Sequence, residues 1–287
     1  MPSPDHHRVL AADAHVVPPP FRAFAVRSDE PCHAFDARSP YARVHVVATD
    51  FLDAAARARL ARAGYAKVDI AEPFAVDYAA TTLDELAAIA AVPDLAGAIA
   101  RALRVTRVLG DEPAAYERAV ATRIDWLASR GADFHNDVAR RWSRSLFWIL
   151  AIDVGEVDFV MPHAGVRLAL ADGDLVVFDQ TMAHGLCRAA DTGRAVAESF
   201  AAGDAARQLF LTGEMLLSDP QWAALGAPWL PVEAHEARGA LDLMVAEFDD
   251  RSGAIQRARS LAACMRRSTC HVEETSGAGP HSDEDVS

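Results

Sequence analysis

The feature that most constrains the fold is a series of short apolar segments in the middle of the chain, separated by turn residues and lacking helical periodicity. Residues 145–152, Ser-Leu-Phe-Trp-Ile-Leu-Ala-Ile, form a nearly unbroken apolar run of strand length, as is typical of a strand covered on both faces. Further segments that we interpret as strands are residues 157–160, 166–170, 175–178, 194–200 and 208–211. Several short strands joined by turns predict an antiparallel sandwich or jelly roll.

One pair of turn residues, Asp172-Gly173, lies between two of these segments and predicts a β-hairpin. Asp-Gly accepts the positive φ angles that a two-residue hairpin turn requires. We therefore expect residues 166–170 and 175–178 to pair with each other.

The sequence before this block shows helix start and stop signals. Asp53 is a suitable N-cap for an Ala/Arg/Leu segment that ends at Gly64, and Thr82 opens a capping box with Glu85. Further helices are expected at about 94–108 and 113–130, and short strands at 43–47 and 65–70. Residues 41–130 should thus form a mainly helical layer packed on the strand-rich core.

The two ends of the chain differ in composition from its middle. Residues 1–40 are rich in Pro and short on periodicity, so we expect them to wrap the surface or to be partly disordered. The strand-rich core with the candidate site should occupy residues 131–215. C-terminal helices are expected within 216–267, one of them over 232–248. Residues 268–287 are polar and acidic, and predict a disordered tail.

The charge of the chain argues against a nucleic-acid partner. The formal net charge is -13, and five of the acidic residues lie from Ser268 to the end, where there is no Lys or Arg. Such a chain repels a phosphate backbone, and the sequence holds no Arg/Lys stripe to overcome this repulsion.

Several catalytic signatures are absent. Lys67 is the only lysine and follows Ala66, so a Walker A loop, which needs Gly-Lys, does not occur. A Schiff-base mechanism would have to use this one lysine, in a segment without any other site signal. Neither GxGxxG nor GxSxG is found, which removes the dinucleotide-binding and hydrolase-elbow signatures.

The chain is expected to act in the cytoplasm and away from membranes. No apolar run approaches the roughly 20 residues that span a bilayer, and the N-terminus does not read as a secretory signal. The four cysteines lack CxxC spacing, which fits a reduced protein better than a disulfide framework. At 287 residues, 51% of them hydrophobic, the chain can bury a sizeable core.

Three residues have the chemistry of a metal site. His135 and Asp137 lie two apart, so on an extended backbone they point to the same side, and His184 follows 47 positions after Asp137. Two neutral imidazoles and one carboxylate hold Fe(II) on one face and leave three positions open for small ligands. The alternative interpretation is that both histidines are ordinary strand-end residues and Asp137 is a turn residue.

The stretch from His135 to Arg194 resembles the Fe(II)/2-oxoglutarate-dependent oxygenases, whose core is a double-stranded β-helix, a form of jelly roll. Their pattern is His-x-Asp, about fifty or more residues, His, about ten residues, Arg. The resemblance covers roughly residues 130–202 and implies that His135, Asp137 and His184 hold iron. It further implies that Arg194 pairs with the distal carboxylate of 2-oxoglutarate in a bidentate contact. The phrase Gly-Asp-Leu-Val-Val-Phe-Asp before the second His also looks like this superfamily.

The sequence departs from the family pattern beside the arginine. Many relatives have Arg-x-Ser, whereas the third residue here is Val196, so the orienting hydroxyl must come from elsewhere. Arg188, four residues after His184, is a rival anchor, and Arg194 could instead be a surface residue.

The implied fold is α+β, a jelly-roll core with flanking helices, and the implied activity is an oxygenase that uses Fe(II), 2-oxoglutarate and O2. Because Asp137 is present, hydroxylation, or desaturation or cyclisation, is favoured over halogenation. The expected substrate is a small molecule such as an amino acid or natural-product intermediate. Two alternatives stay open: a cupin-like jelly-roll metalloenzyme that does not use 2-oxoglutarate, and a non-catalytic jelly-roll binding module.

Overall fold

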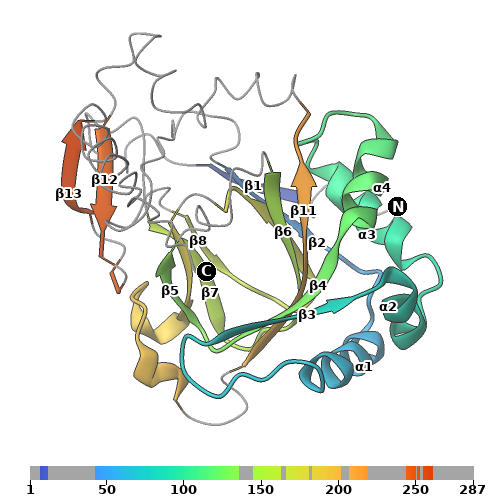
Figure 1. Ribbon diagram of the computed structural model, residues 1–287, viewed down its shortest axis with the longest axis horizontal. Helices are drawn as coiled ribbons and strands as arrows, with labels where there is room; N and C mark the ends of the chain where they lie inside the picture. Colours follow the sequence, from blue (N-terminus) through green and yellow to red (C-terminus); the bar gives the residue numbers. More distant parts are fainter. Residues whose placement is uncertain are drawn as a thin grey trace, which may run out of the picture.

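Antiparallel sheets dominate the chain, which has a mixed α/β structure (Figure 1). The computed structural model describes residues 7–11, 43–135, 145–162, 166–180, 183–201, 207–218, 244–249, 251–252 and 255–260. Within these ranges, three sheets of different size are formed.

The larger sheet has seven strands in the order β1-β2-β9-β6-β11-β4-β3. These strands are β1 (His7–Ala11), β2 (Arg43–Ala48), β3 (Val76–Thr81), β4 (Ile124–Ser129), β6 (Ser145–Asp153), β9 (Asp174–Phe178) and β11 (Gln208–Leu216). Every neighbouring pair is antiparallel.

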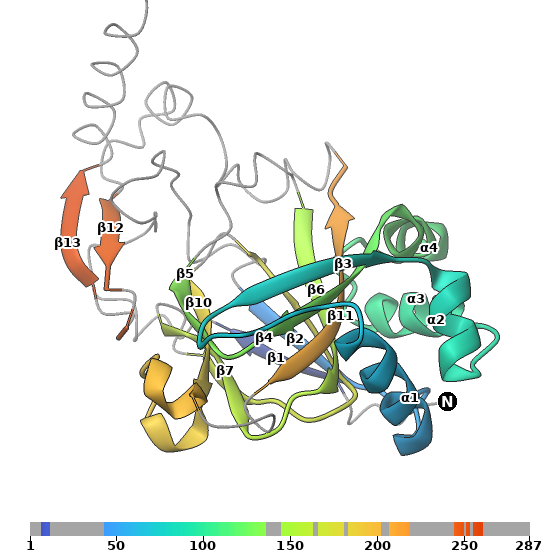
Figure 2. The same cartoon turned by 60° about the horizontal axis from the view of Figure 1, so that its bottom comes forward.

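The smaller sheet has four strands in the order β5-β10-β7-β8 and faces the larger one (Figures 1 and 2). Its strands are β5 (Ala132–His135), β7 (Val157–Met161), β8 (Val166–Ala169) and β10 (His184–Arg188). Two 3-10 helices follow β10, namely η4 (Ala189–Asp191) and η5 (Ala197–Phe200). A separate two-stranded sheet pairs β12 (Met244–Phe248) with β13 (Ile255–Ser260).

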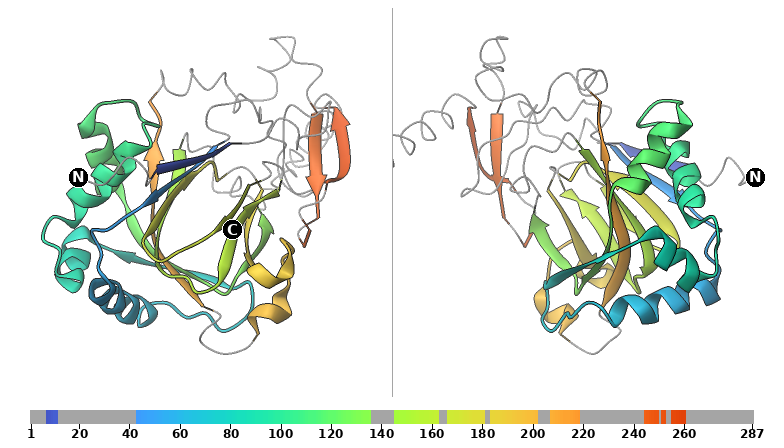
Figure 3. Two further views of the ribbon diagram at one scale, coloured as in Figure 1. Left: turned by 180° about the vertical axis from the view of Figure 1, so that it is seen from behind. Right: turned by 45° about the vertical axis from the view of Figure 1, so that its right-hand side comes forward.

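The α-helices cover the face of the larger sheet that points away from the smaller sheet (Figure 3). They are α1 (Ala54–Tyr65), α2 (Leu83–Ala90), α3 (Leu95–Val105) and α4 (Pro113–Thr122). No single described helix is long and apolar enough to cross a membrane; α2 and α3 meet both criteria only together, with a bend of 101° between them.

Strand β6 shows why an unbroken apolar run was needed at the centre of the sheet. Its even-numbered residues, such as Trp148 and Leu150, belong to the core beneath the helices. Its odd-numbered residues, such as Phe147 and Ile149, belong to the core between the two sheets. Because successive side chains of a strand point to opposite faces, both sets must be apolar. The predicted strand covered on both faces is confirmed.

Helix starts in the outer layer follow the predicted caps. Asp53 accepts a hydrogen bond from the backbone N–H of Ala56, and the Thr82 hydroxyl accepts one from Glu85. A side-chain hydrogen bond also forms where α3 ends, since the Thr106 hydroxyl donates to the Leu103 carbonyl at 2.6 Å.

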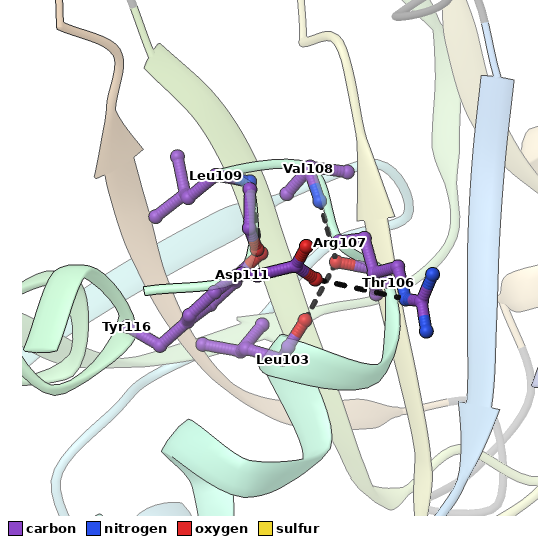
Figure 4. A network of polar contacts seen from close by, with 8 residues as sticks. Leu103, Thr106, Arg107, Val108, Leu109, Asp111 and Tyr116 are labelled. Atoms are coloured by element: carbon purple, nitrogen blue, oxygen red, sulfur yellow. Dashed lines mark hydrogen bonds and ion pairs between the residues drawn. The ribbon is translucent and has the colours of Figure 1, made fainter. Parts of the chain in front are cut away.

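The loop between α3 and α4 is held by one tyrosine (Figure 4). The Tyr116 hydroxyl accepts from the Leu109 N–H and donates to the Gly110 carbonyl, each at 2.9 Å. Because Tyr116 is fully buried, this pairing satisfies a hydroxyl that water cannot reach. The outer layer is therefore fixed by polar contacts as well as by apolar packing.

Two predictions for this layer are wrong. Residues 65–70 are not a strand, since Tyr65 ends α1 and the strand lies further on, as β3. The helix expected over 113–130 ends at Thr122, and Ile124–Ser129 is strand β4. Trp126 of this strand is fully buried between β3 and β11, so packing within the sheet overrides the local helical pattern.

The predicted hairpin across Asp172-Gly173 is also wrong, although both of its strands exist. Strand β8 pairs with β7 in the smaller sheet, whereas β9 pairs with β6 and β2 in the larger one. Both strands direct apolar residues, such as Leu168 and Val176, into the core between the sheets. The core between the sheets is closed because β8 lies on one side of it and β9 on the other. The turn at Asp172-Gly173 therefore connects the two sheets. Gly173 still has the positive φ of 91° that the turn residue suggested.

The predictions for the chain ends have mixed outcomes. Met244–Phe248 is strand β12, so the helix expected over 232–248 is wrong there. His7–Ala11 is strand β1, inside the expected Pro-rich segment. Residues 219–243, within the segment where C-terminal helices are expected, and the acidic tail lie outside the described residues. The boundaries proposed between the segments of the chain stay predictions.

Candidate metal site and cavity

Two of the three predicted metal ligands lie side by side. His135 ends β5 and His184 begins β10, and these two residues are direct partners in the antiparallel pairing of the strands. Their ring centroids are 4.5 Å apart, with the ring planes inclined at 51°. Residues distant in the sequence thus place two imidazoles close enough to bind one ion.

A β-bulge in β5 directs His135 into the interior. Leu186 pairs with Ala132 while His184 pairs with His135, so β5 spans three steps where β10 spans two. Without the extra residue, Ala132 and His135 would face opposite sides of the sheet, because side chains alternate. Both residues in fact line the same cavity.

Gly185 permits the bulge to approach β10. A Cβ atom at this position would lie 3.0 Å from the Ala132 carbonyl oxygen and 3.2 Å from that of Asp133. It would also lie 3.1 Å from the Phe134 ring. Such contacts are tighter than most real Cβ contacts, so glycine is the residue that fits beside the bulge.

The hydrogen bond of His135 sets the ring tautomer that a metal ligand requires. Its Nδ1 lies 2.8 Å from the carbonyl oxygen of Asp133. Because a carbonyl only accepts, Nδ1 carries the proton, and in the neutral ring Nε2 carries the lone pair. A histidine that binds a metal through one ring nitrogen usually donates the N–H of the other to a carbonyl or carboxylate, as His135 does here.

The cavity beside the two histidines is small and lined mainly by aromatic and aliphatic side chains. Its volume is about 60 Å³. The lining comes from both sheets: Val76, Tyr78, Leu127, Ser129, Ala132, His135, Phe147, Ile149, Phe159, Phe178, His184, Gly185, Leu186 and Phe210. The His184 ring packs near Phe178, at 4.9 Å between centroids, and near Phe159, at 6.0 Å. Apart from the histidines, no described residue of this lining is ionisable near neutral pH.

The third predicted ligand, Asp137, lies outside the described residues. Within the described ranges, no group of three or more His, Cys, Asp or Glu residues has the geometry of a metal site. The role of Asp137 therefore stays a prediction, as does the complete ligand set.

The structure places the two candidate arginine anchors differently. Arg194 lies between η4 and η5, not in the strand predicted for residues 194–200, and that strand prediction is wrong. The Arg194 side chain is exposed and does not line the cavity. Its role as the anchor for 2-oxoglutarate stays a prediction.

Arg188 is half-buried and ends the strand that begins with His184. By alternation it shares the face of β10 that carries His184 and Leu186, both of which line the cavity. Its guanidinium lies 5.2 Å from the ring centroid of Phe200, a residue of the core between the sheets. Arg188 is the last residue of β10, so it lies at the opposite end of this strand from His184.

Sequence reasoning missed a polar row at the histidine end of the larger sheet. The Gln180 side-chain amide donates to the Ser145 hydroxyl, which donates to the Glu214 carboxylate, each at 3.2 Å. The available signal was the set of polar residues at even-numbered positions of this segment, Gln208, Thr212 and Glu214. The strand expected from the sequence covers only residues 208–211 and does not reach Glu214, whereas β11 extends to Leu216.

Other ionisable groups lie outside the cavity. Burial raises the pKa of the Cys187 thiol to about 12. At the end of the sheets remote from the histidines, burial raises the pKa of Asp153, and nearby Asp172 raises it further. Burial and this same Asp153 carboxylate raise the pKa of Tyr65, whose hydroxyl donates to Asp153.

No protein-family model matches the chain, and no characterised protein matches its sequence. The chain is similar in backbone to a viral collagen prolyl hydroxylase from Paramecium bursaria Chlorella virus-1 in complex with 2-oxoglutarate. The identity is 9%, 61% of this chain and 96% of that chain are covered, and the TM-score is 0.38.

Two further solved structures are similar to a comparable degree. A Pseudomonas putida prolyl-4-hydroxylase is 18% identical over 61% of this chain and 92% of that chain, with a TM-score of 0.36. The non-heme α-ketoglutarate-dependent epimerase SnoN from nogalamycin biosynthesis is 14% identical over 60% and 78%, also at 0.36. Similarities this distant do not assign a function.

Proposed function

We propose that the chain is a non-haem Fe(II)- and 2-oxoglutarate-dependent oxygenase that hydroxylates, desaturates or cyclises a small molecule. The observation that carries this proposal is the histidine pair: His135 and His184 adjoin across two strands and face a largely apolar cavity. Asp137, two residues beyond His135, completes the sequence pattern of a facial two-histidine, one-carboxylate site.

The side chains present fit such an ion. The Nδ1 proton of His135 is engaged by the Asp133 carbonyl, so its Nε2 has the lone pair that a divalent metal requires. His184 is buried, which shields an ion at this point from bulk solvent on the sheet side. His135, Asp137 and His184 would hold Fe(II), leaving positions for 2-oxoglutarate and O2.

The strand order supports a double-stranded β-helix core. The eight strands from β4 to β11 can be counted from 1 to 8 along the chain. In this count, the larger sheet has the order 6-3-8-1 (β9-β6-β11-β4) and the smaller sheet has the order 2-7-4-5 (β5-β10-β7-β8). A jelly roll, in which two four-stranded sheets enclose one core, would have this strand order. In this proposal β1, β2 and β3 extend the larger sheet at its two edges.

Position favours Arg188 over Arg194 as the anchor for the distal carboxylate of 2-oxoglutarate. Arg188 is half-buried on the cavity face of the strand that carries His184, whereas Arg194 is exposed. Residues four apart in a strand are roughly 13 Å from each other, and an arginine side chain covers part of that distance. A planar guanidinium also matches a carboxylate in a bidentate contact, which the single lysine could not reproduce.

Once bound, the iron and 2-oxoglutarate would supply the oxidising power that removes hydrogen from an unactivated carbon. The protein would supply the surroundings. Phe159 and Phe178 pack beside His184 and exclude water from one side of the site. The paired strands β5 and β10 fix the separation of the two imidazoles.

The alternative enzyme class, a cupin-like metalloenzyme without 2-oxoglutarate, would require no arginine anchor. A non-catalytic binding module would require no metal. Neither is favoured by an observation of this structure. We also propose the cytoplasm as the location, because the cysteine spacing fits a reducing compartment.

Anaerobic titration tests the proposed function directly. Fe(II) protein should develop a metal-to-ligand absorption band on addition of 2-oxoglutarate, and exposure to O2 should release succinate. His184→Ala and Asp137→Ala should abolish stoichiometric Fe(II) binding and succinate release. A wild-type protein that gives neither band nor succinate would exclude the 2-oxoglutarate assignment.

Parallel titrations of Arg188→Ala and Arg194→Ala identify the anchor. Removal of one partner of a buried charge pair typically costs about 2–5 kcal/mol, so the 2-oxoglutarate requirement should rise by roughly 30-fold or more. We expect this increase for Arg188→Ala, with Fe(II) binding retained. The same increase in Arg194→Ala alone would establish the anchor that the sequence pattern implied.

A further inference from the structure

The polar row formed by Gln180, Ser145 and Glu214 lies at the same end of the sheets as the histidine pair. In the larger sheet, Glu214 of β11 is level with Phe147 of β6, which is level with Phe178 of β9. The Phe178 ring in turn packs against His184, at 4.9 Å between centroids. Neighbouring strands are about 4.8 Å apart, so Glu214 lies roughly 10 Å from Phe178 across the sheet.

Glu214 points to the inside of the molecule. In β11 the odd-numbered residues Leu209, Leu211 and Met215 belong to the core beneath the helices. Phe210 belongs to the core between the sheets and lines the cavity. By alternation, Glu214 shares the side of Phe210. It is only partly buried, which fits a position at the rim of the enclosed space.

The hydrogen bonds of the row run toward the carboxylate. Gln180 donates to the Ser145 hydroxyl oxygen, and this hydroxyl donates to one carboxylate oxygen of Glu214. Ser145 and Gln180 are both buried. A chain of donors that ends on a carboxylate orients it and leaves acceptor capacity for a further donor.

No arginine, lysine or histidine among the described residues forms an ion pair with Glu214. A partly buried carboxylate is costly to keep without a cation, because it has lost part of its hydration. Two aromatic side chains, Phe147 and Phe178, lie between Glu214 and the histidine pair. They offer a ligand an apolar surface and the negative faces of their rings. These features complement a molecule with a positive charge at one end and an apolar body.

We propose that Glu214, oriented by Ser145 and Gln180, binds a protonated amino group of the substrate and positions its apolar part across Phe147 and Phe178 toward the histidine pair. This inference rests on the proposed function for the identity of the reacting end. The substrate class is therefore a small amine with an aromatic or aliphatic skeleton. The net charge of the chain, -13, would also favour the approach of a cation.

The test measures binding without relying on turnover. The probes are benzylamine, phenethylamine and 4-phenylbutylamine, each compared with the uncharged alcohol of the same skeleton. Calorimetric titration is carried out at pH 7 on the full chain loaded with Zn(II), which does not support oxidation. A hydrogen bond to a charged group contributes roughly tenfold or more to affinity. We expect at least one amine to bind about tenfold more tightly than its alcohol.

Glu214→Gln separates this site from a general charge effect. The variant should reduce the amine affinity by about tenfold, toward that of the alcohol, and leave the alcohol affinity unchanged. Glu198→Gln is the matched control, because it removes the same charge from an exposed position on η5. It should bind both probes like the wild type.

Three results would overturn the proposal: no preference for any amine, equal losses in both variants, or unchanged amine affinity in Glu214→Gln. Failure of the proposed function looks different. In that case amine binding would depend on Glu214, but 2-oxoglutarate would produce no absorption band and no succinate. Conversely, an active oxygenase without amine preference would refute this inference alone.

Discussion

Substitution of Gly185 by alanine should affect both stability and metal binding, because this residue faces the bulge that directs His135 inward. The added Cβ would lie 3.0–3.2 Å from three atoms, two of which are backbone carbonyl oxygens of the bulge. Backbone atoms in a paired strand cannot move without disturbing the pairing. Insertion of one methyl group into such a site typically costs about 1–3 kcal/mol. For a chain of this size, that loss lowers Tm by roughly 2–10 °C.

The same displacement should weaken the metal site. Relief of the contacts requires the Ala132–Asp133 backbone to shift, and the Asp133 carbonyl holds Nδ1 of His135. Changes in the partners that orient metal ligands typically reduce affinity by about 10–100-fold. Co(II) binding under anaerobic conditions, followed by visible absorption, should therefore weaken by about tenfold or more in Gly185→Ala. Urea unfolding gives the stability loss independently.

A control must lose stability without touching the site. Ile152→Val removes one methylene from the core beneath the helices, at the end of β6 remote from the histidines. Such a change typically costs about 0.5–1.5 kcal/mol. We expect Ile152→Val to bind Co(II) with wild-type affinity. Equal Co(II) affinities in Gly185→Ala and wild type would refute the link between the bulge and the metal site.

Two further predictions follow from shifted pKa values. Cys187, fully buried with a pKa raised to about 12, should react with a thiol reagent at pH 8 only when the protein is unfolded, which is checked by comparing labelling rates in buffer and in denaturant. The pKa of Asp153 is raised, so the folded state holds the carboxyl proton more tightly than the unfolded chain does. The contribution of Asp153 to the free energy of unfolding therefore falls as the pH rises from about 3.8 through the raised pKa. Asp153→Asn should therefore raise Tm at pH 7 and change it little at pH 3; a lower Tm at pH 7 would contradict the assignment.

Local signals in the sequence were sufficient where the structure depends on neighbouring residues. The caps Asp53 and Thr82 form the predicted side-chain hydrogen bonds, and the apolar run of β6 is buried on both faces. By contrast, the partner of each strand depends on residues far away in the chain. The turn at Gly173 adopts the expected φ, yet its two strands lie in different sheets.

The site could be predicted only in part for the same reason. The types and spacing of His135 and His184 predicted that they would meet, and they are cross-strand partners. The bulge in β5 adds one residue to one strand only, and no local sequence pattern predicts it. The family pattern implies Arg194 as the anchor, and residues 194–200 are expected to form a strand. The chain instead forms 3-10 helices there, which leave this side chain exposed.

The turn that joins β8 to β9 has a mechanical consequence. The Thr49 N–H and hydroxyl both donate to the Gly173 carbonyl, and the Gly173 N–H donates to the Ala151 carbonyl at 2.8 Å. Asp172 also accepts from the N–H of Val154. These bonds hold the turn that follows β8 against the larger sheet, at the end remote from the histidines. Because β8 of the smaller sheet leads directly into this turn, we expect relative motion of the two sheets to be smallest at this end and largest where His135 and His184 meet. Amide hydrogen exchange should accordingly be slowest at Gly173 and grow faster along β9 toward Phe178.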